Sequence, residues 1–123
     1  MKSIEWLDIR DNKIEDISVL SGLPNMKKLF FSNNKIKSIV PLSNMSGLRW
    51  VLMENNGIEN LWPMYNLTNL TDAMAFGNDL ENNEQLSKIN KKVIEKLKEQ
   101  GTIFHLTSTE VASIYRLEPS KKL

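Results

Sequence analysis

The chain has 123 residues, of which 41% are hydrophobic and 25% charged, and its formal net charge is +1. This length suits one domain, and this composition is typical of a soluble, folded chain. The near-neutral charge gives no overall field that would favour nucleic acid or an anionic membrane, and the absence of cysteine excludes disulfides, thiolate metal sites and a cysteine nucleophile.

The N-terminal segment, residues 1–17, carries charged side chains every few residues and has no apolar core of the kind that signal peptides contain. No stretch of the chain approaches the roughly 18 consecutive apolar residues of a transmembrane helix. We therefore expect a cytoplasmic protein that does not bind membranes.

An asparagine recurs every 22 residues in the first two-thirds of the chain, at Asn12, Asn34, Asn56 and Asn78. Apolar residues recur three and five positions before each asparagine and two, five, eight, eleven and fourteen positions after it, although Asn83 breaks one column and the last column has only three members. Such a repeat predicts stacked coils, because one coil alone buries only a thin apolar edge. We predict about four coils over residues 1–83.

Each coil is predicted to contain a short strand just before its asparagine. Apolar residues alternate with other residues there, as at Leu7 and Ile9 or Leu29 and Phe31, and period-two alternation indicates a strand with one buried face. The asparagine amide has two donors and two acceptor lone pairs, enough to satisfy backbone groups of the turn that follows.

The segment 84–123 is predicted to belong to the same domain and to cover the open end of the repeat core. Its first part has apolar residues at helical spacing, which predicts a helix that Asn82 or Asn83 caps and Gly101 ends. Residues 102–106 follow as an edge strand.

A second helix is predicted after this strand, through about residue 117. Thr107 and Glu110 have the spacing of a capping box at its start. The segment 84–123 therefore reads as a helix–strand–helix cap.

The repeat pattern, as in residues 34–42 and 66–70, closely resembles the 22-residue leucine-rich repeats of the bacterial internalin type over about residues 4–82. The resemblance implies an α/β fold, a right-handed curved solenoid with a parallel sheet on its concave side and 3₁₀ or extended segments on its convex side. Members usually bind other proteins. This chain departs from secreted members because its repeats begin almost at Met1, without a helical N-terminal cap, and weaken after Leu80.

We find no pattern of catalytic, cofactor-binding or metal-binding residues in the sequence. The single histidine, His105, has no cysteine to pair with and cannot form a multi-ligand zinc site alone. The acidic residues Asp11, Glu15 and Asp16 lack the spacing of a calcium loop, and no glycine-rich phosphate loop occurs. We therefore predict a non-enzymatic protein without a cofactor.

The strand positions between the buried ones are predicted to face the concave side, because side chains alternate along a strand. They hold Trp6, Asp8 and Arg10 in the first coil, Lys28, Phe30 and Ser32 in the second, Trp50, Leu52 and Glu54 in the third, and Asp72, Met74 and Phe76 in the fourth. Phe30, Leu52 and Met74 would form one apolar ladder with charged residues around it. We predict that all of these positions are exposed and that, apart from Ser32, they form a surface that binds another protein.

Four alternatives remain open. The C-terminal segment would cover this surface if it folded back, and a second copy would bury it in a homodimer. The uncapped first coil would also suit a self-assembling structural unit or a fragment of a longer repeat protein. A small binding protein of this kind would also suit a phage or mobile-element inhibitor, similar to anti-CRISPR proteins, that blocks a target enzyme. The lysines of segment 84–98 would suit weak nucleic-acid contact, although a solvated helix face explains them equally. Trp62 is given no predicted role.

Overall fold

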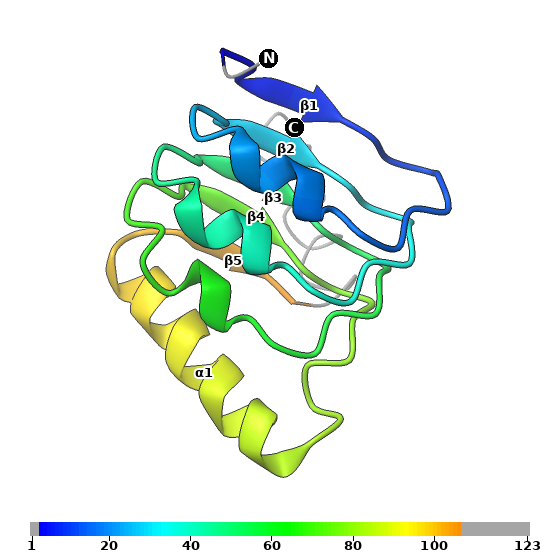
Figure 1. Ribbon diagram of the computed structural model, residues 1–123. Coiled ribbons are helices and arrows are strands. Elements are labelled where there is room, and N and C mark those ends of the chain that lie inside the picture. The colour runs from blue at the N-terminus through cyan, green and yellow to red at the C-terminus, as the bar shows by residue number, and fades with distance from the viewer. Residues whose placement is uncertain (1–2, 107–123) are drawn as a thin grey trace, which may run out of the picture.

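A computed structural model describes residues 3–106, and within them the chain winds into stacked coils that a single long helix follows (Figure 1). The strands are β1 (Trp6–Asp8), β2 (Lys28–Phe30), β3 (Trp50–Leu52), β4 (Asp72–Met74) and β5 (Ile103–His105). The 3₁₀ helices are η1 (Ser18–Gly22), η2 (Val40–Asn44) and η3 (Trp62–Met64), and the α-helix is α1 (Glu84–Glu99).

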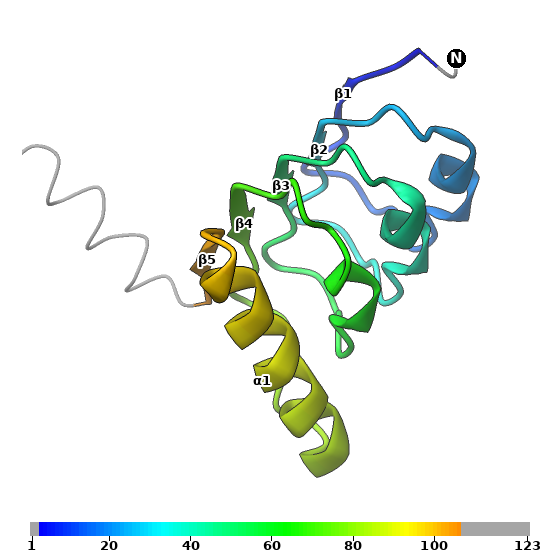
Figure 2. The ribbon, with the colours of Figure 1, turned by 90° about the vertical axis from the view of Figure 1, so that its left-hand side faces the viewer.

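The strands form one parallel sheet in the order β1-β2-β3-β4-β5, as the resemblance to leucine-rich repeats implies. Neighbouring coils pair with a constant shift of 22 residues, so Leu7 lies opposite Leu29, and Leu29 opposite Val51. Viewed from the side, the strands line one edge of the solenoid and the 3₁₀ helices line the other (Figure 2). This arrangement confirms the predicted parallel sheet and repeat solenoid.

The core consists of the predicted apolar columns. In the second and third coils these residues are fully buried, as Phe31, Ile36 and Met53 are. In the first coil the corresponding Ile9 and Ile14 are only partly buried. The same column is therefore less covered at the N-terminal end, where the described residues provide no coil above it.

The repeated asparagine satisfies the backbone of two coils at once. Asn34 Nδ2 donates to the carbonyl oxygens of Phe31 (2.8 Å) and Ile9 (3.0 Å), and its Oδ1 accepts the backbone N–H of Ile14 (3.1 Å). Asn56 and Asn78 make the same set of bonds one and two coils later. The predicted role of this column is confirmed.

A second polar column, which the sequence analysis missed, lies one residue before the first. Asp11, Asn33, Asn55 and Gly77 all have positive φ, from 54° to 78°. Asn33 Nδ2 donates to Asp11 Oδ1 (2.7 Å), and Asn55 Nδ2 donates to Asn33 Oδ1 (2.8 Å). Asparagine and glycine tolerate this left-handed backbone better than other residues. The signal was present as a 22-residue spacing of turn-forming residues.

Helix α1 begins and ends as predicted. The Asn83 side chain caps it by accepting the backbone N–H groups of Gln85 (2.8 Å) and Leu86 (3.2 Å). At its other end Gly101 has φ +101°, and the N–H of Thr102 donates to the carbonyl of Leu97 (2.9 Å). This pattern is a Schellman motif, which requires the left-handed residue that glycine supplies.

Helix α1 lies at the C-terminal end of the stacked coils (Figure 2), and its buried Val93 and Leu97 belong to the repeat core. Asn90, also buried, accepts the N–H of Leu61 (2.8 Å) and donates to the carbonyls of Glu59 (2.8 Å) and Leu80 (2.9 Å). Helix α1 thus covers the last coil with apolar side chains and also satisfies its open backbone groups.

The predicted edge strand is confirmed as β5, whereas the second predicted helix, with Thr107 and Glu110, lies outside the described residues. Within residues 3–106, no helix has the length and apolar character needed to cross a bilayer.

Candidate binding surface on the concave face

The strand register brings the predicted surface residues into two parallel rows across the sheet. The first row is Trp6, Lys28, Trp50, Asp72 and Ile103, and the second row is Asp8, Phe30, Leu52, Met74 and His105. The predicted neighbours Phe30, Leu52 and Met74 are therefore adjacent. His105 and Ile103, which the sequence analysis did not assign to this surface, extend the rows onto the fifth strand.

Three rings from the first three strands pack together on this face. The Phe30 ring meets Trp6 at 6.1 Å and Trp50 at 5.5 Å between centroids, both with an interplanar angle of 72°. Such edge-to-face contacts stabilise an aromatic pair by about 0.5–1.5 kcal/mol beyond its apolar burial. We call Trp6, Phe30 and Trp50 the aromatic cluster.

The cluster holds two cations against its rings. Lys28 Nζ lies 5.0 Å from the Trp6 ring centroid and 5.7 Å from that of Trp50, while the Arg10 guanidinium lies 5.3 Å from the Phe30 centroid. At these distances the ring faces attract the positive charges. The side chains of the cluster are therefore ordered by contacts among themselves, before any partner is present.

Polar side chains at and just after the C-terminal ends of the strands pair with one another. Arg10 donates to both carboxylate oxygens of Asp8, at 2.9 and 2.7 Å, and this side-chain hydrogen bonding lowers the pKa of Asp8. The hydroxyl of Ser32 donates to Glu54 Oε1 at 2.6 Å. These contacts fix the polar border of the aromatic cluster.

The prediction that all these positions are exposed is wrong for three of them. Phe30 is 7% exposed because two tryptophan rings and a guanidinium surround it, and Ser32 and Leu52 are also buried. Leu52 lies between Phe30 and Met74 in register. If each strand is considered alone, these side chains project into water. In the sheet, side chains on adjacent strands cover them.

The other predicted residues range from half-buried to exposed. Lys28, Glu54, Asp72, Met74 and Phe76 are half-buried. Trp6, Asp8, Arg10 and Trp50 are exposed, with Trp6 at 62% and Trp50 at 36%. The accessible apolar surface is thus centred on the two tryptophans rather than on the predicted ladder.

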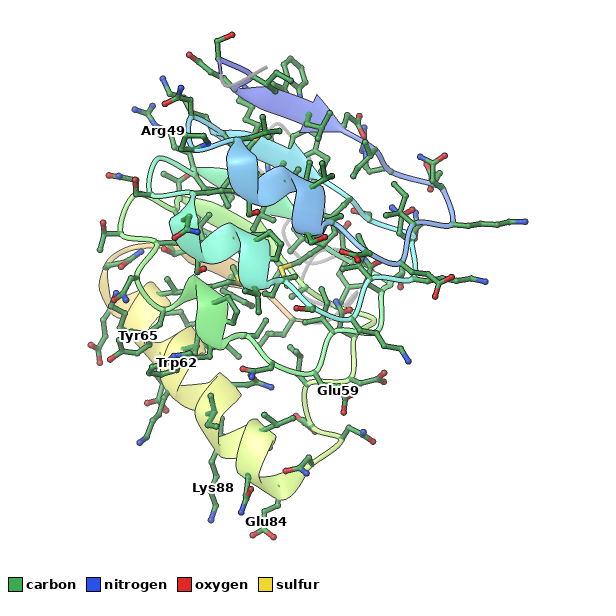
Figure 3. All side chains as sticks on the ribbon, in the orientation of Figure 1. Arg49, Glu59, Trp62, Tyr65, Glu84 and Lys88 are labelled. Carbon is green, nitrogen blue, oxygen red and sulfur yellow. The ribbon has the colours of Figure 1, made fainter. Side chains whose placement is uncertain are left out.

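Trp62 lies apart from the aromatic cluster, on η3. It is 52% exposed and stacks on Tyr65 at 4.7 Å with an interplanar angle of 24°. Lys96 of α1 lies over the Tyr65 ring, with its Nζ 4.8 Å from the ring centroid. Figure 3 shows Trp62 and Tyr65 side by side next to α1.

The single histidine is a buried residue of the sheet. His105 is buried in β5, opposite Met74, and within residues 3–106 no group of three or more His, Asp or Glu side chains is placed to hold a metal ion. The surface described here offers rings, paired charges and one cation between two rings.

Comparison with known proteins agrees with the repeats and the fold. A family model for leucine-rich repeats, in two copies, matches residues 2–44. Internalin C2 from Listeria monocytogenes is 35% identical with a TM-score of 0.62, and the match covers 63% of this chain and 34% of that chain. No curated protein sequence matches.

Two further solved structures show the fold alone. An internalin of Listeria monocytogenes is 24% identical with a TM-score of 0.51, covering 63% of this chain and 29% of that chain. A leucine-rich-repeat protein of Leptospira interrogans is 19% identical with a TM-score of 0.68, covering 84% of this chain and 25% of that chain. The chain spans about a third or less of each of these proteins.

The chain is a leucine-rich-repeat solenoid. Its repeats are similar to those of bacterial internalins, which confirms the resemblance predicted from the sequence. Solenoids of this kind present extended concave surfaces and generally serve as protein-interaction modules. The inhibitor, homodimer and nucleic-acid hypotheses and the cytoplasmic location stay predictions.

Proposed function

We propose that this chain is a non-enzymatic module that binds a protein partner on its concave face, with Trp6 and Trp50 as the main anchors. The observation that carries the proposal is the aromatic cluster, in which two exposed indoles are held in place by a buried phenylalanine. Tryptophan is enriched at the energetic centres of protein interfaces, because one ring covers a large area and has few torsions to order.

The setting of the two tryptophans supports the same proposal. Their backbone belongs to a five-stranded sheet, and their rings already contact Phe30 and Lys28, so binding orders few additional torsions. Preorganisation of this kind increases affinity by lowering the entropic cost of association. Asp8 and Arg10 beside them supply a polar border, as at the rim of an interface.

The test compares tryptophans on different sides of the molecule. Trp6→Ala and Trp50→Ala are expected to weaken capture of the partner by more than about tenfold, the scale of an interface hot spot. Trp62→Ala, which removes an equally large and exposed ring next to α1, is the matched control and should leave capture unchanged. Quantitative mass spectrometry of proteins retained by the wild type and each variant provides the measurement.

A protein captured equally by the wild type, Trp6→Ala and Trp50→Ala would contradict the proposal. Circular dichroism of each variant separates this result from a loss of folding. Because both tryptophans are exposed, their replacement is expected to leave the helix and sheet signals intact.

A further inference from the structure

The position of Lys28 at the centre of the aromatic cluster indicates what kind of partner this face accepts. Lys28 is the first residue of β2 and lies in register between Trp6 and Trp50. Its Nζ lies over both indole faces, at 5.0 and 5.7 Å from their centroids. Lys28 is half-buried as a residue, and cation–π attraction holds its ammonium against the two rings.

This ammonium has no negative partner among the described residues. Arg10 is paired with Asp8 (2.7 Å), and Lys27 is paired with Glu5 (3.5 Å), whereas within residues 3–106 Lys28 forms no ion pair. A cation that lacks a counter-charge attracts an anionic group from a binding partner.

A second unpaired cation strengthens the positive potential at this edge. Arg49 directly precedes Trp50, is exposed and forms no ion pair within the described part of the chain. Figure 3 shows it projecting outward on the side where the strands begin. Around Trp6 and Trp50, the cations Lys27, Lys28 and Arg49 outnumber the carboxylates Glu5 and Asp72, a balance of three minus two, or +1.

The cluster geometry argues against other ligand classes. A cationic side chain of a partner would find the space between the indoles already occupied by Lys28. Stacked nucleobases need a continuous positive groove for their phosphates beside the rings, but here Asp8 and Asp72 lie in the two rows, and Lys28 already lies over one face of each indole. A carboxylate flanked by apolar side chains matches both the ammonium and the exposed indoles.

From this arrangement we infer that the concave face selects a partner segment with an aspartate or glutamate set among apolar residues, and that Lys28 receives its carboxylate. The inference rests on the proposed protein-binding function and specifies its chemistry. Lys28 then acts as a specificity-determining residue, whereas Trp6 and Trp50 provide most of the contact area.

The test uses a phage-displayed library of random linear peptides selected on the folded wild-type chain. Selected peptides are expected to carry Asp or Glu next to apolar residues. Synthetic copies should bind Lys28→Met on the order of tenfold more weakly, because hydrogen bonds to charged groups are stronger than neutral ones. Lys28→Arg should retain the preference for acidic peptides, and the exposed Lys37→Met is the control.

Salt dependence and amide versions of the same peptides sharpen the result. Replacing the peptide Glu by Gln should weaken binding to the wild type and have little effect on binding to Lys28→Met, because the two changes remove the same pair. Affinity for the wild type should fall as salt is raised, and the slope should be smaller for Lys28→Met.

The outcomes distinguish this inference from the proposed function. Selected peptides without an acidic excess, or with equal affinity for Lys28→Met, overturn the role of Lys28; if Trp50→Ala still abolishes their binding, the concave face remains the binding surface. Peptides indifferent to both Trp6→Ala and Trp50→Ala, or a selection that yields no binder, contradict both. Lys28-dependent binding of a labelled single-stranded oligonucleotide at low salt also overturns the inference, because the anion would then be phosphate.

Discussion

The apolar core is covered to different extents at the two ends of the solenoid. At the C-terminal end, α1 covers the last coil with Val93 and Leu97 and satisfies its backbone through Asn90. At the N-terminal end of the described residues, the first coil leaves Ile9 and Ile14 partly exposed. Position in the stack, rather than residue type, therefore determines how much of a repeat column is buried.

This difference shows what a repeat residue contributes. Ile14, Ile36 and Ile58 have the same side chain at the same position of successive coils, yet only Ile36 and Ile58 are fully buried. Each coil is covered by its two neighbours, so a column residue with one neighbour loses part of its burial. Apolar stabilisation follows the area removed from water.

The largest expected effect tests whether position in the stack determines the stability contribution of residues in one column. Ile58→Ala should lower the free energy of unfolding by about 4 kcal/mol, because it creates a cavity between two coils. Ile14→Ala should cost only about 1 kcal/mol, because its side chain is partly hydrated in the folded state. Urea denaturation followed by circular dichroism measures both values, and equal costs would contradict the dependence on position.

The next effect concerns the polar part of the C-terminal cap. Asn90→Ala should lower stability by about 3 kcal/mol, because it leaves the N–H of Leu61 and two carbonyls without their partner in a buried place. Asn12→Ala, which removes an exposed member of the asparagine column, should cost less than about 1 kcal/mol, since water replaces it.

Hydrogen exchange gives a local readout of the Asn90 change. The amide of Leu61 should lose protection in Asn90→Ala while the amides of β2 and β3 keep theirs at matched stability. Unchanged protection of Leu61 would show that the backbone finds another partner and that the cap does not depend on this side chain.

A smaller effect separates backbone strain from side-chain crowding. Gly101→Ala should cost about 1 kcal/mol, because φ is +101° but no atom lies within 4 Å of the added Cβ. Gly77→Ala should cost about 2 kcal/mol, because its positive φ adds to a Cβ placed 2.1 Å from Asn55 Oδ1. Thermal unfolding of the two variants measures the difference. A larger loss of stability for Gly101→Ala would contradict the close contact between Gly77 and Asn55 in the second polar column.

The smallest effect lies at the exposed N-terminal edge. The side-chain hydrogen bonds from Arg10, followed by its backbone N–H, lower the pKa of Asp8 below its ordinary value of 3.8. The depressed folded-state pKa means that the contribution to stability is present above the unfolded value and is lost as pH falls through the lower folded value. NMR titration of Arg10→Gln should show the pKa of Asp8 rising toward 3.8.

Asp16 provides the control for this titration. Its pKa is lowered by the backbone N–H and then the side chain of Ser18, not by an arginine, so Arg10→Gln should leave it unchanged. A shift of both groups would indicate a general change in the first coil instead of the loss of one ion pair.

The sequence by itself determined the winding of this chain. A constant 22-residue spacing predicted the stacked coils, the buried columns and the role of the asparagines, and the resemblance to leucine-rich repeats implied the parallel sheet. Helical spacing, Asn83 and Gly101 likewise predicted α1 with both of its ends. The individual strands, the helix and its caps follow short-range rules that act within one coil or one helix, and the constant coil length then places equivalent residues of successive coils side by side.

Only the tertiary structure decided which surface residues water can reach. Alternation correctly placed Phe30 and Leu52 on the concave side, but their burial depends on the sizes and rotamers of side chains 22 residues away. The same holds for Lys28 between its two indoles and for Asn90 on the last coil. Such contacts arise between side chains on different coils, and no pattern along a single strand or helix specifies them.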